Sequence, residues 1–363
     1  MDPHGPMAKR FPLVARFRPA CLPLPNRVQA LVDLADRSAA QNDQGLASAV
    51  FNQAALLASD VGLPDLARSL CHRHAQAYLN ACPLPATSAI RALEPLINLA
   101  RLQIRAGHPY DARQRLLALY EAVGTATPAT FDGITVPANL TPTDEDRRDV
   151  HAWLWRVLLA DGTRTLTTTG RWPEALAHIE QHRGIGTRML DGRQVAVVAA
   201  LVEGNTNRAT ELLTNTSPGE PWEQIVTACL MVLCRNDNGQ PVEEHITDLV
   251  NAYLTHEAEP GLTVFDIRLG LTVLDTMSTA DHPEARRLTA SLVRRTTDAG
   301  DGYAARELLA HPLATSLSTA REAQHFHGLA QACALGASTL HQELYADLSA
   351  VLDAADTVLT RPA

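Results

Sequence analysis

The fold of this chain is decided by a turn, Gly170-Arg171-Trp172-Pro173-Glu174-Ala175. A glycine at the first position allows the left-handed backbone conformation that ends a helix. The alanine that closes the stretch is small enough to let the next helix pack closely. A proline near the start of that helix is tolerated, because the first helical turn leaves its N–H groups unpaired. The stretch therefore predicts a helix, a tight turn and a second helix.

The same turn returns along the chain. A second copy begins at Gly204, 34 residues after Gly170, and ends at Ala209. Four looser copies keep the five-residue spacing from the first position to a closing alanine: Gly62–Ala67, Gly107–Ala112, Ala280–Ala285 and Gly300–Ala305. One of them, Ala280–Ala285, has alanine in place of the first glycine. Four of the six copies carry a proline where the second helix should begin. Repetition of one helical hairpin predicts an all-α fold of about sixteen helices.

These copies resemble the tetratricopeptide repeat (TPR), whose period is about 34 residues. The small and large residues of that repeat correspond in the best copy to Leu159, Leu166, Gly170, Trp172, Ala175 and Ile179. The copies are degenerate, because the aromatic-Leu-Gly start and the closing proline of the repeat are missing. The chain is also similar to the helical sensor halves of actinobacterial regulators and to related stand-alone proteins. The resemblance implies a TPR-like α-solenoid that takes part in protein–protein interaction.

Composition excludes several classes of protein. Of the 363 residues 46% are hydrophobic but only 4% are aromatic, so alanine and leucine must build a core of closely packed helices. The net charge of −9 argues against a general surface for nucleic acid or anionic membranes. Six scattered cysteines indicate reduced thiols, and no apolar run approaches the ~18 residues of a membrane span. We expect a cytoplasmic protein with no direct nucleic-acid or membrane partner.

Sequence patterns divide the chain into segments. A Pro-rich stretch without helical period predicts an extended or disordered arm. A later stretch is rich in Thr and Pro and places Asp132-Gly133 between β-branched and aromatic residues, which predicts a small hairpin or an ordered loop, either an insertion at one end of the solenoid or a lid over a groove. The expected segments are the arm 1–25, N-terminal helical repeats 26–123, the loop or hairpin 124–142, and C-terminal TPR-like repeats 143–363.

The chain contains no catalytic signature of a common enzyme class, neither a phosphate loop nor a nucleophile elbow nor a His-Glu-x-x-His motif. The densest titratable cluster holds Cys71, His74 and Tyr78, which share one face of a helix. They are candidates for a thiol or imidazole acid–base site, and the alternative is core packing around a hydrogen-bonded histidine. We expect no cofactor, and whether the chain is an enzyme stays open.

Two histidine pairs are candidate metal ligands. His178 and His182 lie one turn apart, but no third histidine or carboxylate at useful spacing joins them, and the neighbouring Arg183 would repel a cation. His325 and His327 are two residues apart and cannot chelate from one helical face. The sequence therefore predicts no metal site.

The loop between residues 182 and 194 is the most suggestive surface. If Thr187 caps the following helix, free N–H groups would face an anion there. The guanidiniums of Arg188 and Arg193 could then clamp a carboxylate or phosphate, and Arg183 of the same stretch is a further candidate ligand-binding residue. The alternative is a solvated loop whose arginines pair with acidic neighbours.

Aromatic anchors and the expected fold together suggest a function. All four tryptophans lie between residues 153 and 222, and Trp153, Trp172 and Trp222 are candidate anchors for a ligand. The first hypothesis is a scaffold or regulator that binds a peptide or protein segment in the groove of a solenoid. The alternative is a substrate-binding or catalytic component of a peptide-modifying complex, such as one of ribosomal peptide maturation. A transcriptional regulator would need a helix-turn-helix, which the sequence does not supply.

Overall fold

The protein is almost entirely helical. The structure, a computed structural model, describes residues 1–277 and 279–361. Apart from one short hairpin, the regular elements of these residues are helices, so the all-α prediction is confirmed. No helix among them is both long and apolar enough to cross a membrane.

The chain forms two compact units, and each unit is assembled from two separate stretches of sequence. Unit 1 contains residues 1–22 and 166–333, and unit 2 contains residues 23–165 and 334–363. The boundaries of these units differ from the boundaries of the segments that the sequence patterns predict. A compact unit is defined by which apolar faces pack together and not by where the composition changes.

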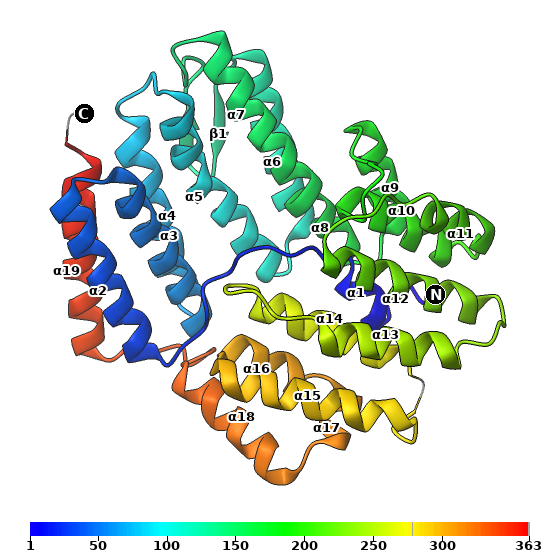
Figure 1. Cartoon of the computed structure of the whole chain (residues 1–363). Coiled ribbons are helices and arrows are strands. Elements are labelled where there is room, and N and C mark those ends of the chain that lie inside the picture. Colours follow the sequence, from blue (N-terminus) through cyan, green and yellow to red (C-terminus); the bar gives the residue numbers. More distant parts are fainter. Residues whose placement is uncertain (278, 362–363) are drawn as a thin grey trace. The chain divides into compact units, whose positions relative to one another are not determined.

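Unit 2 consists of helices, one hairpin and a π-helical turn. Its elements are α2 (Leu24–Gln41), α3 (Gln44–Val61), α4 (Pro64–Leu79), α5 (Ala86–Arg105), α6 (Pro109–Thr125), β1 (Ala129–Phe131), β2 (Ile134–Val136), α7 (Asp144–Val157), the π-helix η1 (Leu158–Gly162) and α19 (Gln342–Leu359). Helix α19 packs against α2 and α3, far from it in sequence (Figure 1). Its buried face carries apolar residues at helical spacing, from Leu348 and Val351 to Ala355 and Leu359, and completes the core of the unit.

Unit 1 begins within α8 (Thr163–Thr167) and also contains the N-terminal residues. Its other helices are α1 (Pro6–Arg10), α9 (Trp172–Gln181), α10 (Asp191–Val202), α11 (Thr206–Thr214), α12 (Pro221–Asp237), α13 (Glu243–Thr255), α14 (Thr263–Asp275), α15 (Pro283–Ala299), α16 (Gly302–Leu309), α17 (Pro312–Leu317) and α18 (Ala320–Ala332). Helices α10 and α14 are buried on nearly every side, from Gly192 to Leu201 and from Val264 to Leu274. A helix that is enclosed in this way can be apolar all round, and these two form the centre of the unit.

The predicted turn geometry is confirmed at four of its six copies. Gly62, Gly107, Gly170 and Gly204 all have positive φ angles. In each case the next residue donates its N–H to a carbonyl five residues earlier, at 2.8–3.0 Å. The alanine that closes each of the six copies has no exposed surface: Ala67, Ala112, Ala175, Ala209, Ala285 and Ala305. The turn therefore ends one helix and allows the next to pack closely, as expected.

The predicted hairpin is also present. Strands β1 and β2 pair in antiparallel register, with Phe131 opposite Ile134, and Asp132 and Gly133 at the tip have φ angles of 50° and 83°. The apolar side chains of the hairpin are buried in the core of unit 2. The carboxylate of Asp132 accepts a hydrogen bond from Arg68 of α4 at 2.9 Å and forms an ion pair with Arg115 of α6 at 3.2 Å. The hairpin is thus an integral part of that core and is not a lid.

The N-terminal residues are ordered. Residues 1–22 are extended apart from α1, and they lie against unit 1 with Ala8, Phe11, Leu13 and Cys21 buried. A disordered arm is one of the two forms that the prolines predict, and the structure has the extended form. The apolar side chains order the arm because they enter the core of the unit.

Candidate functional site

Helix α12 contributes one wall of the candidate site. It begins with Pro221 after Glu220, and the carboxylate of Glu223 accepts the N–H of Glu220 at 3.1 Å, which completes a capping box. Val226 and Leu230 face the core and have no exposed surface. The apolar residues of this helix extend beyond that face, so part of its apolar surface is left at the side of the helix.

Helix α13 contributes the other wall. Ile246, Val250 and Tyr253 are buried in the unit, where the hydroxyl of Tyr253 donates to the carbonyl of Asp266 at 3.0 Å. The opposite side of the helix carries polar side chains, among them His245 and Asp248, which are exposed. The helix is amphipathic, and its border between apolar and polar residues faces α12.

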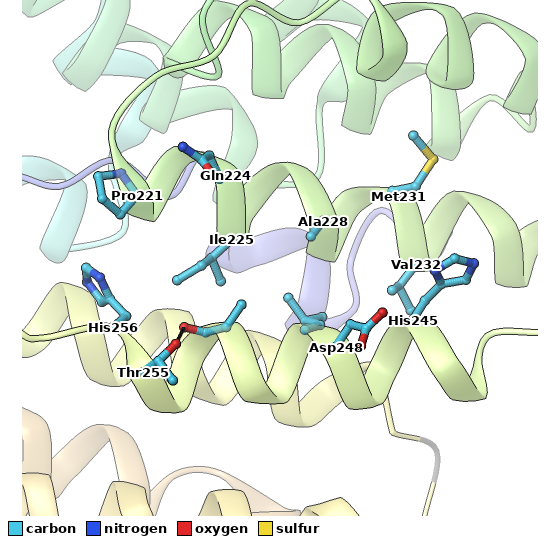
Figure 2. Close-up of a pocket in the computed structure, with 12 residues that line it drawn as sticks. Pro221, Gln224, Ile225, Ala228, Met231, Val232, His245, Asp248, Thr255 and His256 are labelled. Carbon is cyan, nitrogen blue, oxygen red and sulfur yellow. Dashed lines mark hydrogen bonds between the residues drawn. The ribbon is translucent and has the colours of Figure 1, made fainter.

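A groove of about 500 Å³ lies between these two helices. Figure 2 shows Ile225 from α12 and Asp248 from α13 pointing into the space between the helices. The buried side chains of Ile225, Val232 and Leu249 form the floor, with exposed fractions of 4%, 3% and 1%. The complete lining is Pro221, Gln224, Ile225, Ala228, Met231, Val232, His245, Asp248, Leu249, Ala252, Thr255 and His256.

The chemistry of this groove suits binding. Its floor is apolar, with Met231 as an adaptable side chain at the wall. Asp248 is the one carboxylate in the lining, and within the part of the chain that the structure describes it has no ion pair. The described residues also hold no cluster of three potential metal ligands. An apolar floor with one uncompensated negative charge at the rim fits an amphipathic ligand that carries a cation.

The candidate acid–base residues lie in the core of unit 2. Cys71, His74 and Tyr78 share a face of α4 as predicted, and each is at most 3% exposed. Nε2 of His74 is 2.8 Å from the hydroxyl of Ser48, and the imidazole stacks on Phe51 with the ring centres 5.3 Å apart. Burial lowers the pKa of His74 to about 3 and raises the pKa of the Cys71 thiol to about 12. Burial also raises the pKa of Tyr78, whose hydroxyl donates to the carbonyl of Gln44.

Those protonation states favour the packing alternative. A thiol with a pKa near 12 gives almost no nucleophilic thiolate at neutral pH. An imidazole with a pKa near 3 is too weak a base to take up a proton there. The cluster is therefore a hydrogen-bonded part of the core.

The tryptophans do not gather at one surface. Trp172 has no exposed surface, and its indole N–H donates to the carbonyl of Pro3 at 3.4 Å. Trp222 is 8% exposed and meets Phe265 edge to face, with the ring centres 5.4 Å apart. Both belong to unit 1, whereas Trp153 lies half-buried against the core of unit 2. Because their rings are occupied by core contacts, these side chains are not exposed anchors for a ligand.

The three arginines that the sequence offers as ligand-binding residues have different environments. Arg193 is 7% exposed, and its guanidinium donates to the carbonyls of Leu212 at 2.7 Å and Gly186 at 3.1 Å. Arg188 is exposed and pairs with the buried carboxylate of Glu223. Arg183 is exposed in the same loop. The guanidiniums of Arg188 and Arg193 are thus already engaged by oxygens of the protein, so they stabilise the loop and do not form a clamp.

The helix that follows this loop begins later than predicted. Helix α10 starts at Asp191 with Leu190 at the N-cap position, so Thr187 does not cap it. The carbonyl of Thr187 instead accepts the N–H of Ser217 at 2.9 Å. The prediction of an anion-binding helix N-terminus at Thr187 is therefore wrong. Thr187 instead pairs this loop with Ser217, which lies between α11 and α12.

The histidine pair of α9 contributes to packing. His178 is 1% exposed, and its ring meets that of His182 edge to face with centres 4.8 Å apart.

The sequence contains a signal for the groove, although this signal is a spacing of apolar residues and not a motif. Ile225, Ala228 and Val232 recur at helical spacing on α12, and Leu249 and Ala252 do so on α13. Both stripes lie beside the face that the core requires. An apolar stripe wider than the core needs is the sequence sign of an additional contact surface.

No protein-family model, curated protein or solved structure matches this chain.

Proposed function

We propose that this protein is a cytoplasmic, TPR-like α-solenoid that acts as a scaffold or regulator by binding a peptide segment of a partner protein. The observation that carries the proposal is the groove between α12 and α13, with its buried apolar floor and the carboxylate of Asp248 at the rim. The repeated turns, each with its buried alanine, support the solenoid part of the proposal.

The occupant we propose is an amphipathic helix. The lining of α12 runs from Pro221 to Val232, which at ~1.5 Å per residue spans roughly 16 Å, or about three helical turns. A third helix laid along two packed helices inserts side chains at positions i, i+3, i+4 and i+7 into the groove between them. A lysine or arginine on that helix would meet Asp248.

A role in peptide modification has less support. The acid–base cluster expected around His74 is buried and not accessible to substrate, and its imidazole is neutral at physiological pH. A substrate-binding role in such a complex would use the same groove as the proposed scaffold. We therefore propose binding and not catalysis.

The proposal can be tested with a displayed library of 14-residue helical peptides. Peptides selected on the wild-type protein are synthesised with a fluorophore, and their affinity is measured by anisotropy. The variant Ala228→Trp fills the groove from its wall and should weaken binding at least about tenfold. The variant Asp248→Asn should weaken binding of basic peptides only.

The matched control is Ala177→Trp, which adds the same side chain at an exposed position of α9 in the same unit. It should leave the affinity unchanged, and circular dichroism should show all variants to be folded. If the selected peptides bind Ala228→Trp as tightly as wild type, the groove is not the binding site and the proposal fails.

A further inference from the structure

Residues 1–22 lie on unit 1 in the manner of a bound peptide. After α1 the chain is extended, and Phe11 and Leu13 are buried at 1% and 3% exposure with the half-buried Pro12 between them. Figure 1 shows this segment as a blue trace that leaves α1, which contacts α14. Alternation of inward and outward side chains is how an extended ligand is held on a protein surface.

A buried glutamine recognises the backbone of this segment. Gln194 of α10 has no exposed surface. Its side-chain oxygen accepts the N–H of Leu13 at 2.6 Å, and its side-chain nitrogen donates to the carbonyl of Leu13 at 2.7 Å. The same nitrogen donates to the carbonyl of Met189 at 2.9 Å, which fixes the amide in place. Gln194 thus binds both the N–H and the carbonyl of Leu13. These contacts require an extended backbone and do not depend on the side chain at this position.

The backbone of the segment is bound at two further places. The N–H of Arg18 donates to the carbonyl of Gly261 at 2.9 Å. The carbonyl of Cys21 accepts the N–H of Gly302 at 2.8 Å, and the N–H of Cys21 donates to the carboxylate of Asp301 at 3.3 Å. Gly261 has a φ angle of 82°, which favours glycine, and a Cβ there would meet the ring of Phe17.

Each arginine of residues 1–22 meets a partner on unit 1. Arg10 pairs with Asp275, whose other oxygen lies 2.9 Å from Nε2 of the buried His311. Arg16 donates to both oxygens of Asp191, at 2.8 and 2.7 Å. The guanidinium of Arg18 lies 3.6 Å from the centre of the Tyr303 ring. The surface therefore recognises cationic side chains at three defined positions.

The outer side of the segment is uncovered. The side chain of Arg16 is 50% exposed, Phe17 is 76% exposed, and Leu22 at the boundary with unit 2 is 38% exposed. Local opening of the segment, which has to withdraw Phe11 and Leu13 from the unit, would begin at these exposed residues.

We propose that this arm-binding surface, formed by Asp191, Gln194, Gly261, Asp275, Asp301 and Tyr303, is a second site for a partner protein and takes an extended basic segment. Residues 1–22 occupy it as an internal ligand that the partner displaces. The ligand has an arginine followed by two apolar residues with one residue between them, and then two arginines at the positions of Arg16 and Arg18. The residue on Gln194 is not proline, because its N–H is required. This proposal does not rest on the groove between α12 and α13.

The test uses the full chain with a protease site inserted between Leu22 and Pro23. The folded protein is cleaved, and a fluorescent peptide of residues 1–22 is added. The peptide should bind the cleaved protein saturably and bind the uncut protein at least about tenfold more weakly, because the tethered arm competes for the surface. A second peptide keeps Arg10, Phe11, Leu13, Arg16 and Arg18 in a Ser/Ala background and should compete with the first.

Methylation of the peptide nitrogen at Leu13 tests the recognition without changing the protein. It removes the N–H that Gln194 accepts and should weaken binding at least about tenfold. A scrambled peptide of the same composition is the control for charge alone. The proposal is overturned if the cleaved protein keeps its arm and admits no labelled peptide, or if unit 1 unfolds once the arm leaves. Equal binding of the methylated or scrambled peptide, or failure of the Ser/Ala peptide to compete, also overturns it.

Discussion

At the scale of single residues, polar side chains that could serve chemistry are used to stabilise the cores. His74 is enclosed by Phe51, Ser48 and Tyr78, and its imidazole stays neutral because burial disfavours the charged form. The residue types and their shared helical face could be predicted from sequence. Their burial depends on neighbours from another helix, such as Ser48 of α3. The sequence of α4 alone therefore could not decide between an acid–base site and core packing.

The low pKa of His74 predicts a pH dependence of stability. Above about pH 6.5 the imidazole is neutral in both the folded and the unfolded state, so the full stability is present. Below that pH the unfolded state takes up the proton and the folded state does not, down to its pKa of about 3. The free energy of unfolding should therefore decrease as pH falls, by up to about 1.4 kcal/mol per pH unit from this residue.

Urea unfolding at pH 7, 6 and 5 measures this effect. The variant His74→Gln should lose less stability between pH 7 and 5 than the wild-type protein. His325→Gln changes an exposed histidine and should leave the pH dependence as it is in wild type. Parallel curves for wild type and His74→Gln would contradict a depressed pKa at this position.

Arg193 provides a second prediction at this scale. Its guanidinium donates to Leu212, Gly186 and the hydroxyl of Thr216, at 2.7, 3.1 and 3.3 Å. Arg193→Met leaves these acceptors without their donor and should decrease the free energy of unfolding by about 2–3 kcal/mol. Arg183→Met, in the exposed part of the same loop, should change it by less than about 0.5 kcal/mol. Equal effects in chemical denaturation would show that Arg193 does not stabilise the loop.

At the scale of the element, the turns were the most predictable feature. The signal is local: a glycine that adopts positive φ and an alanine that must be small both act within a few residues of the turn. The start of α10 was less predictable. Thr187 has the residue type of an N-cap, but its carbonyl is paired with Ser217, a contact 30 residues away that no local pattern encodes.

The buried alanines predict a specific intolerance. Ala175 of α9 has no exposed surface, and Ala175→Leu adds three carbons at a close helix contact. We expect a loss of about 1–3 kcal/mol in the free energy of unfolding. Ala177→Leu makes the same change on the exposed side of the same helix and should be nearly neutral. The prediction fails if thermal denaturation gives the two variants the same midpoint.

At the scale of the whole molecule, the chain passes between the two units more than once. Unit 2 is completed by residues that follow the whole of unit 1 in sequence. This arrangement could not be predicted from repeats or composition, because it depends on the fit of the apolar face of α19 to α2 and α3. The choice between an extended and a disordered arm could not be made for a related reason, since the order of the arm comes from side chains such as Gln194 far along the chain.

Deletion of residues 334–363 tests the closure of unit 2. Six buried apolar residues of α19 would be lost, namely Leu348, Val351, Leu352, Ala355, Val358 and Leu359. At about 1.5–3 kcal/mol for each large side chain, the loss should exceed the stability of the unit. Hydrogen exchange should show loss of amide protection in α2 and α3 and its retention in α10 and α14.

Coexpression of residues 334–363 as a separate chain is the control and should restore protection in α2 and α3. Unchanged protection after the deletion alone would mean that α19 is dispensable for unit 2.

The late position of α19 also affects how the protein is made. A ribosome that adds about 5–20 residues per second needs roughly 15 s to 1 min to pass from α3 to α19. During that time α2 and α3 are outside the ribosomal tunnel with the face that α19 covers exposed to solvent. Unit 2 can therefore complete its core only after α19 has left the ribosome, and the nascent chain offers chaperones an apolar binding surface until then.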